Sequence, residues 1–224
     1  MKNRPAKGCR GVERFEEEKR RRVGEGAKDG LRGERRTAVC GVRFEKREDL
    51  SRILEHQLGR EPRGRVRVAL SCKLGMPMVI TTYPVLAPVK NDRGIGKGIA
   101  IFPTTFWLTC PRLNRAVADL EAGGWIGRIK GMLRDNWEVR ERLLRAHRHY
   151  ASARMELLTP DDREMLEGRF PSILRALAET GVAGIKDVTN PEAVKCLHAH
   201  YAHYLAGYDN PIGEWVDAAL FGLL

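Results

Sequence analysis

The residues best suited to chemistry gather in residues 195–203, a segment with one lysine, one cysteine and three of the six histidines of the chain. If this segment is helical, Cys196, His200 and His203 stand at i, i+4 and i+7 and share one face. Thiolate and neutral imidazole bind transition metals and carry protons. The spacing therefore indicates a metal site built from these three side chains, or a catalytic site.

The opposite face of the same helix would carry Lys195 and His198. An ammonium group binds anions, and an imidazole moves protons near neutral pH. The i, i+4, i+7 pattern also fits an ordinary core stripe, because cysteine is among the most often buried residue types. Both interpretations stay open from the sequence alone.

A second cysteine, Cys110, directly precedes Pro111, a residue type favoured at the first position of a helix. That places Cys110 at an N-cap, where the helix dipole stabilises a thiolate, with Arg112 adding positive charge. A buried cysteine at a strand–helix corner is the alternative. We expect Cys110 and residues 196–203 to meet in one pocket, because the helix is too polar on two faces to be buried without partners.

Charge is uneven along the 224 residues, whose formal net charge is +11. Residues 1–40 hold 13 Lys/Arg and 7 Asp/Glu, and they contain few large apolar side chains. Such a composition predicts a disordered basic extension. It is either a solvated tail or an arm that binds nucleic acid, with Arg20, Arg21 and Arg22 as its densest basic run.

The remaining composition is typical of a water-soluble globular protein. No apolar run is long enough to span a membrane, and the N-terminus lacks a secretory pattern, so we expect a cytoplasmic protein. Five cysteines without a CxxC pair favour reduced thiols over disulfides. We also expect no structural zinc, since paired cysteine ligands are missing.

Local patterns predict an α+β fold in one domain over residues 41–224. The sheet part spans about residues 64–110, with strands over 64–73, 78–89 and 99–108, and it packs on a mainly helical part over about 111–224. The glycine-rich loop at residues 91–99 departs from phosphate-loop motifs and indicates a hairpin connection. Helices are expected over 48–58, 111–122, 126–133 and 137–158, and after the prolines at 160, 191 and 211.

The chain resembles a bacterial family catalogued as domain of unknown function 501. The resemblance rests on QLGREPRG at residues 57–64, FPTTFWLTCP at 102–111, KCLH at 195–198, AH at 202–203 and NPIG at 210–213. It implies no established activity. Genes of the family often lie near polyphosphate phosphatase genes, which implies some relation to phosphate chemistry. The residues that match family motif positions are Cys110, Lys195, Cys196, His198, His203 and Asn210.

Together these observations suggest a cytoplasmic enzyme or binding protein with a Cys/His/Lys pocket for a phosphate-containing ligand, of hydrolase type if it is an enzyme. The alternatives are a non-enzymatic RNA- or nucleotide-associated protein and a structural interaction protein. A transition-metal cofactor is compatible with the first. The catalytic candidates are Cys110, Cys196, His198 and His203, and the ligand-binding candidates are Arg112, Lys195 and Asn210.

Overall fold

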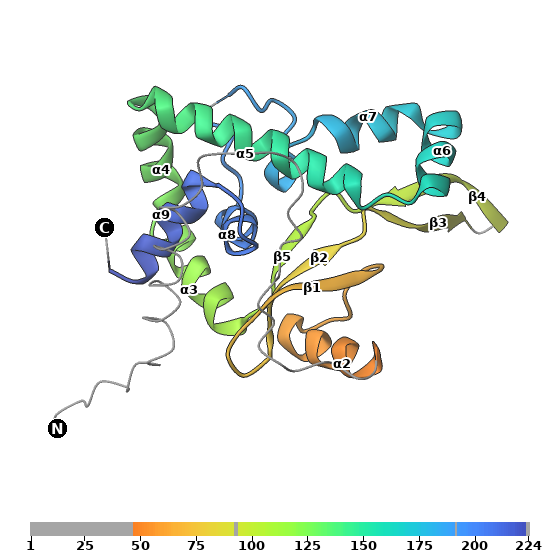
Figure 1. Ribbon diagram of the computed structural model, residues 1–224, viewed down its shortest axis with the longest axis horizontal. Coiled ribbons are helices and arrows are strands. Elements are labelled where there is room, and N and C mark those ends of the chain that lie inside the picture. The colour runs from red at the N-terminus through yellow and green to blue at the C-terminus, as the bar shows by residue number, and fades with distance from the viewer. Residues whose placement is uncertain (1–46, 92–93, 191, 223–224) are drawn as a thin grey trace, which may run out of the picture. The chain divides into compact units, whose positions relative to one another are not determined.

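The computed structural model describes residues 47–91, 94–190 and 192–222. The fold is α+β, as predicted: a small antiparallel sheet near the start of the described chain is followed by a series of helices (Figure 1). The predicted basic extension of residues 1–40 lies outside the described residues. Its separation from the domain therefore stays a prediction.

Three strands form the sheet that positions the site. β1 (Val66–Ser71) and β2 (Pro77–Thr82) pair antiparallel, with Val68 opposite Ile80. β5 (Phe106–Leu108) pairs antiparallel with the other side of β2, so that Ile80 also stands opposite Trp107. The strand order β1-β2-β5 leaves β5 at an edge of this sheet.

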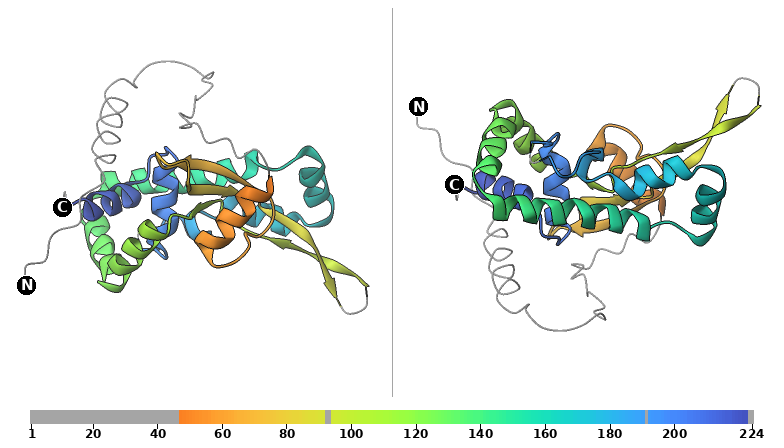
Figure 2. Two further views of the ribbon diagram at one scale, coloured as in Figure 1. Left: turned by 90° about the horizontal axis from the view of Figure 1, so that it is seen from below. Right: turned by 90° about the horizontal axis from the view of Figure 1, so that it is seen from above.

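Between β2 and β5 the chain forms a separate hairpin of β3 (Val85–Asn91) and β4 (Gly94–Ile101), which extends away from the three-stranded sheet (Figure 2). The predicted hairpin is confirmed by the antiparallel pairing of β3 and β4, but most of the loop predicted over residues 91–99 belongs to β4. The predicted single strands over 78–89 and 99–108 were too long, because each stretch contains two strands. The breaks fall at Pro84 and Pro103, which have no backbone N–H for a ladder.

The helical part begins directly after the sheet. Pro111 opens α3 behind Cys110, and Thr159 caps α6 by accepting a hydrogen bond from the backbone N–H of Asp162. A helix also precedes β1. The helices are α2 (Arg47–Leu58), α3 (Pro111–Ala122), α4 (Trp125–Arg134), α5 (Trp137–Glu156), α6 (Pro160–Arg169), α7 (Pro171–Glu179), the 3-10 turn η1 (Val182–Gly184), α8 (Leu197–Leu205) and α9 (Pro211–Leu220).

The histidine-bearing helix α8 is shorter than predicted. It begins at Leu197, not near residue 191. Asn190 accepts a hydrogen bond from the backbone N–H of Glu192 through its side chain, and this local turn competes with a helix start. Cys196 has an extended backbone with φ of −150° and forms the N-cap. Lys195 and Cys196 therefore lie before the helix, and the predicted face shared by Cys196, His200 and His203 does not exist.

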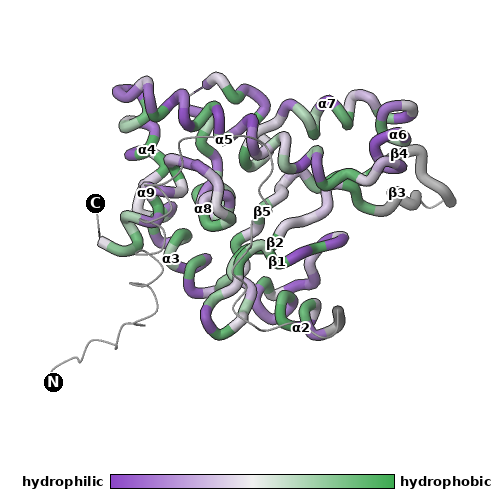
Figure 3. The backbone as a smooth tube through the Cα atoms, viewed as in Figure 1, coloured by the Kyte–Doolittle hydropathy of each residue, from purple (hydrophilic) through white to green (hydrophobic). Residues whose placement is uncertain are grey.

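α8 lies at the centre of the main core. It packs against β5, α3 and α9, and its buried side chains surround the helix, including Leu197, Tyr201 and Leu205. α5 covers the core from one side, and the colour of its tube alternates between purple and green, as expected for a helix with one buried face (Figure 3). A smaller core under α6 and α7 holds Leu166 and Leu177.

Candidate functional site

The start of α8 borders an open cleft of about 400 Å³. Its walls come from the end of α2 and the loop after it, from β5 and the loop before it, from the first turn of α3, from η1 and from the start of α8. The cleft thus combines a basic residue, aromatic side chains and a thiol–imidazole pair. The lining residues are Leu58, Arg60, Thr104, Phe106, Trp107, Leu108, Asn114, Ala183, Cys196, His198 and Ala199.

Two of the predicted catalytic residues meet at this cleft, together with an acid that the sequence analysis missed. Nδ1 of His198 lies 3.9 Å from Sγ of Cys196 and 3.3 Å from Oε1 of Glu121. One ligand atom from each of the three residues lies within 4.8 Å of the others, so Glu121, Cys196 and His198 could hold a metal ion. All three side chains are half-buried.

Backbone contacts hold this group in place. Oε1 of Glu121, near the end of α3, accepts a 2.6 Å hydrogen bond from the backbone N–H of Leu197. The carboxylate therefore satisfies one of the open N–H groups at the start of α8. On its other side, His198 places Nε2 3.0 Å from the carbonyl oxygen of Asn114. Both contacts tie the first turn of α8 to α3.

The charge around His198 favours its protonated form. Its pKa is raised from 6.5 to about 9, chiefly by the hydrogen bond to Cys196, with burial opposing the shift and the Asn114 carbonyl and the Glu121 carboxylate adding to it. The surroundings of Nδ1 therefore stabilise positive charge. A thiol sulfur and a carboxylate oxygen both lie within 3.9 Å of this nitrogen.

Arg60 supplies a cation elsewhere in the cleft wall. Its guanidinium lies over the Trp107 ring, 4.7 Å from the ring centroid. Trp107 is in turn held by an edge-on contact with Phe102. Within the described residues no carboxylate forms an ion pair with Arg60. Arg60 follows α2 and belongs to the segment QLGREPRG at residues 57–64, which resembles the family. That resemblance was the sequence signal that could have identified Arg60 as a site residue.

The other histidines of α8 belong to a buried polar cluster. Nδ2 of Asn210 lies 3.2 Å from Nδ1 of both His200 and His203, while its Oδ1 accepts a hydrogen bond from the backbone N–H of Gly213. The ring of His147 on α5 lies 5.7 Å from that of His200. Within the described residues, Nε2 of His200 has no hydrogen-bond partner.

Burial keeps these imidazoles neutral. Desolvation lowers the pKa of His147 to about 4 and that of His200 to about 3, and it holds the pKa of His203 well below 6.5. Among the described residues, Cys196, His200 and His203 do not gather as a metal-binding group, contrary to the predicted ligand set. The reason is the late start of α8, which separates the thiol from the helix face that carries the two imidazoles.

The remaining predicted site residues do not line the cleft. Cys110 is a half-buried N-cap of α3, one turn before Asn114, and His203 is buried. Arg112 and Lys195 are exposed. Asn210 is fully buried as the N-cap of α9. Their predicted roles stay predictions, as does that of the tail arginines Arg20, Arg21 and Arg22, which lie outside the described residues.

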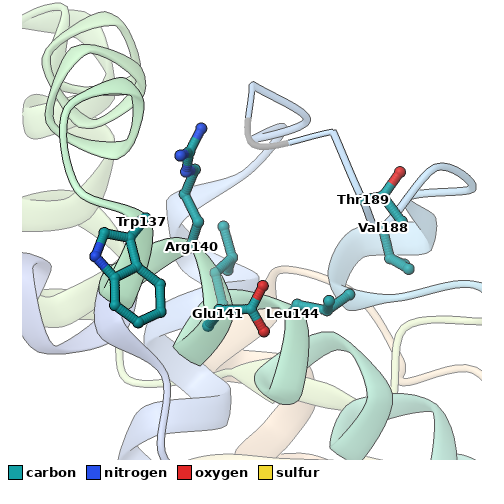
Figure 4. A pocket seen from close by; sticks show the side chains of 7 residues that line it. Trp137, Arg140, Glu141, Leu144, Val188 and Thr189 are labelled. Atoms are coloured by element: carbon teal, nitrogen blue, oxygen red, sulfur yellow. The ribbon is translucent and has the colours of Figure 1, made fainter.

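A second hollow of about 380 Å³ lies between the start of α5 and the segment after η1 (Figure 4). Trp137, Arg140, Glu141 and Leu144 border it from α5, and Val188 and Thr189 face them. It contains no cysteine or histidine. The cleft beside Cys196 therefore remains the better candidate site.

Comparison with known proteins gives a family and no activity. A family model described as a protein of unknown function (DUF501) matches residues 68–218, which is more than half of the chain. This stretch includes Glu121, Cys196 and His198 and leaves out Arg60. No curated protein and no solved structure matches. The described helices include none long and apolar enough to cross a membrane.

Proposed function

Because the chain belongs to the DUF501 family, which has no known function, its activity must be argued from its own cleft, and we propose that it binds and hydrolyses a phosphate-containing small molecule there. One observation carries the proposal: a single cleft is lined by a cation, Arg60, and by a thiol–imidazole pair, Cys196 and His198. Binding and chemistry would thus share one cavity.

Arg60 is suited to hold the phosphate. A guanidinium presents planar, paired N–H donors that match two phosphate oxygens, and it keeps its charge at any physiological pH. Stacking on Trp107 restricts the side chain before a ligand arrives, which reduces the entropy lost on binding. Arg112 and Lys195, the cations that the sequence suggested for this role, do not line the cleft.

The group around His198 is suited to the hydrolytic step. Hydrolysis of a phosphate ester adds water to phosphorus and breaks the phosphorus–oxygen bond to the leaving group, so the water loses a proton and the leaving oxygen gains one. Imidazole, thiolate and carboxylate each carry protons, and here Glu121, Cys196 and His198 converge on one point. Asn114 holds the imidazole in position from the first turn of α3.

We assign this activity to the cytoplasm. The cysteine count is odd, and the three described cysteines, Cys72, Cys110 and Cys196, are all free. Free half-buried thiols are typical of proteins kept in a reducing compartment.

The first test compares two arginines in similar settings. Arg60→Gln should weaken binding of inorganic phosphate or a phosphate monoester by about 10- to 100-fold, because one charged hydrogen-bonding partner contributes about 1.5–3 kcal/mol. Arg128→Gln is the matched control, since Arg128 also stacks on a tryptophan, Trp125, but lies outside the cleft lining. Calorimetric titration of the full chain measures both.

Hydrolysis is tested separately by phosphate release from a panel of phosphate monoesters, diesters and nucleotides. Cys196→Ser and His198→Gln should abolish turnover while leaving phosphate binding at Arg60 within a few fold of the unchanged chain. Cys72→Ser, which removes a free half-buried thiol outside the cleft lining, should leave both intact. If the two arginine variants bind phosphate alike, or no compound of the panel is cleaved, the proposal is wrong.

A further inference from the structure

We propose that Glu121, Cys196 and His198 bind a divalent transition-metal ion of the zinc class, with a further coordination position facing the cleft. Thiolate, imidazole and carboxylate are the three ligand types that zinc uses in proteins. The described part of the chain brings one of each together here. The metal binding stands on its own, whereas a role for the metal in hydrolysis rests on the proposed function.

The two ligand-atom separations from Nδ1 of His198 are close to those of a tetrahedral ion. Bond lengths of about 2.1 Å to nitrogen and oxygen and about 2.3 Å to sulfur, at tetrahedral angles, place nitrogen about 3.4 Å from oxygen and about 3.6 Å from sulfur. Nδ1 of His198 lies 3.3 Å from Oε1 of Glu121 and 3.9 Å from Sγ of Cys196. The sulfur thus lies about 0.3 Å farther from Nδ1 than the tetrahedral separation. All three ligand atoms lie within 4.8 Å of one another.

The tautomer of His198 is fixed for metal binding through Nδ1. Nε2 faces the carbonyl oxygen of Asn114 at 3.0 Å, and a carbonyl can only accept, so Nε2 carries a proton and donates it. In the neutral imidazole the lone pair is then on Nδ1, the atom that faces Cys196 and Glu121. A donor bond from the far ring nitrogen to a carbonyl is the usual outer support of a metal-bound histidine.

The backbone carbonyl of Asn114 that contacts His198 is itself held in place. The backbone N–H of Asn114 donates to the carbonyl of Cys110 at 2.9 Å in the first turn of α3, and its side-chain Nδ2 donates to the carbonyl of Leu108 at 3.1 Å. The carbonyl that orients His198 is therefore held between β5 and α3. A ligand held by two ordered elements loses little freedom when it binds an ion.

Charge and exposure also suit a dication. Cys196 is the N-cap of α8 and so lies at the positive end of the helix dipole, which favours negative charge nearby. With Glu121, two negative ligands would face the ion. Cys196 and His198 line the open cleft, so a water molecule or a ligand oxygen reaches a metal held there. Three protein ligands and an open position are typical of a catalytic metal site, in which the metal lowers the pKa of its water.

The test is titration of the metal-free full chain with Co²⁺, a spectroscopic substitute for Zn²⁺, followed by competition with Zn²⁺. We expect one ion per chain and a near-ultraviolet absorption band from thiolate-to-cobalt charge transfer. Cys196→Ser should abolish the band and weaken binding by more than about 100-fold, the upper end of what loss of an outer-shell partner costs. Cys72→Ser should keep both.

Two further variants test the other ligands. His198→Gln and Glu121→Gln should each weaken Co²⁺ binding by a similar factor, and the amide of the second variant still accepts the hydrogen bond from Leu197. Circular dichroism of each variant confirms that it is folded. If Cys196→Ser binds Co²⁺ as tightly as the unchanged chain, or if the unchanged chain gives no thiolate band, the metal site is refuted.

The metal site and the proposed function fail in different ways. Arg60→Gln should leave the Co²⁺ titration unchanged while it weakens phosphate binding. Metal binding without phosphate hydrolysis would leave the site intact and refute the hydrolase. Phosphate binding and turnover in chain treated with a chelator would refute a role for the metal in hydrolysis and keep the hydrolase.

Discussion

Acid should destabilise this protein through His147, a histidine that is only 1 % exposed. Its Nδ1 accepts a 3.1 Å hydrogen bond from the backbone N–H of Val182, so that nitrogen has no proton. The pKa is lowered from 6.5 to about 4 because burial penalises the charged imidazolium. In the unfolded chain the same group titrates near 6.5. The folded state therefore takes up the proton only at a lower pH.

The direction and the size of this change in the free energy of unfolding follow from proton linkage. Between pH 6.5 and 4 the unfolded chain binds more protons than the folded one, so stability is full above about pH 6.5 and is lost as the pH falls towards 4. From pH 7 to pH 5, His147 alone should lower the free energy of unfolding by about 2 kcal/mol. His200 and His203 shift in the same direction and add to the loss.

Urea denaturation at pH 7 and pH 5 measures the effect, and a variant isolates it from the titration of carboxylates. His147→Gln removes the titrating group and keeps an acceptor for Val182. The loss of stability between the two pH values should be about 2 kcal/mol smaller in this variant. His56→Gln, the same substitution at an exposed position on α2, is the control for the substitution itself.

The reasoning is refuted if the unchanged chain and His147→Gln lose the same free energy between pH 7 and pH 5. Equal losses would mean that, at pH 5, His147 binds its proton as readily in the folded chain as in the unfolded chain. The buried position and the hydrogen bond from Val182 would then not describe the protein in solution.

Two other pairs of variants test the packing around this cluster by urea unfolding. Asn210→Ala should cost about 3 kcal/mol, since it removes an N-cap and leaves buried imidazoles without their partner, whereas the exposed N-cap change Asn136→Ala should cost only about 1 kcal/mol. Gly181→Ala should cost about 1–3 kcal/mol, because its Cβ would lie 2.5 Å from the His147 ring, whereas Gly168→Ala, in open space on α6, should stabilise by about 0.5–1 kcal/mol. Equal effects within either pair would contradict the packing described.

The fold was largely predictable because its boundaries are set by local residue chemistry. Proline at the first helical position after a capping residue marked the starts of α3, α6 and α9. The same pattern at Asn190 did not start α8, because the Asn190 side chain makes a turn instead. Pro84 indicated an edge or a bent strand over residues 78–89, where the structure has two strands, and the break at Pro103 was missed.

Of the candidate site, only the residues with a thiol or an imidazole side chain could be identified from the sequence. Cys196 and His198 were candidates because of their types. Glu121 and Asn114 were not, because nothing in an exposed-helix pattern indicates that α3 runs beside the start of α8. His200 and His203 are buried, in line with the core interpretation that the spacing also allowed. Their Nδ1 atoms each lie 3.2 Å from Nδ2 of Asn210, which comes from a separate loop.

Ala183, in the wall of the cleft, has a left-handed backbone with φ of 56°, which is unusual for a residue with a side chain. Holding it costs about 1 kcal/mol, and the packed turn around it must supply that energy when the chain folds. The shape of this wall is therefore set before any ligand arrives. Ala183→Gly would leave stability nearly unchanged, since it relieves strain and also frees the unfolded chain. What it should change is rigidity: the more mobile wall would bind the same ligand with a larger entropy loss and a shorter residence time.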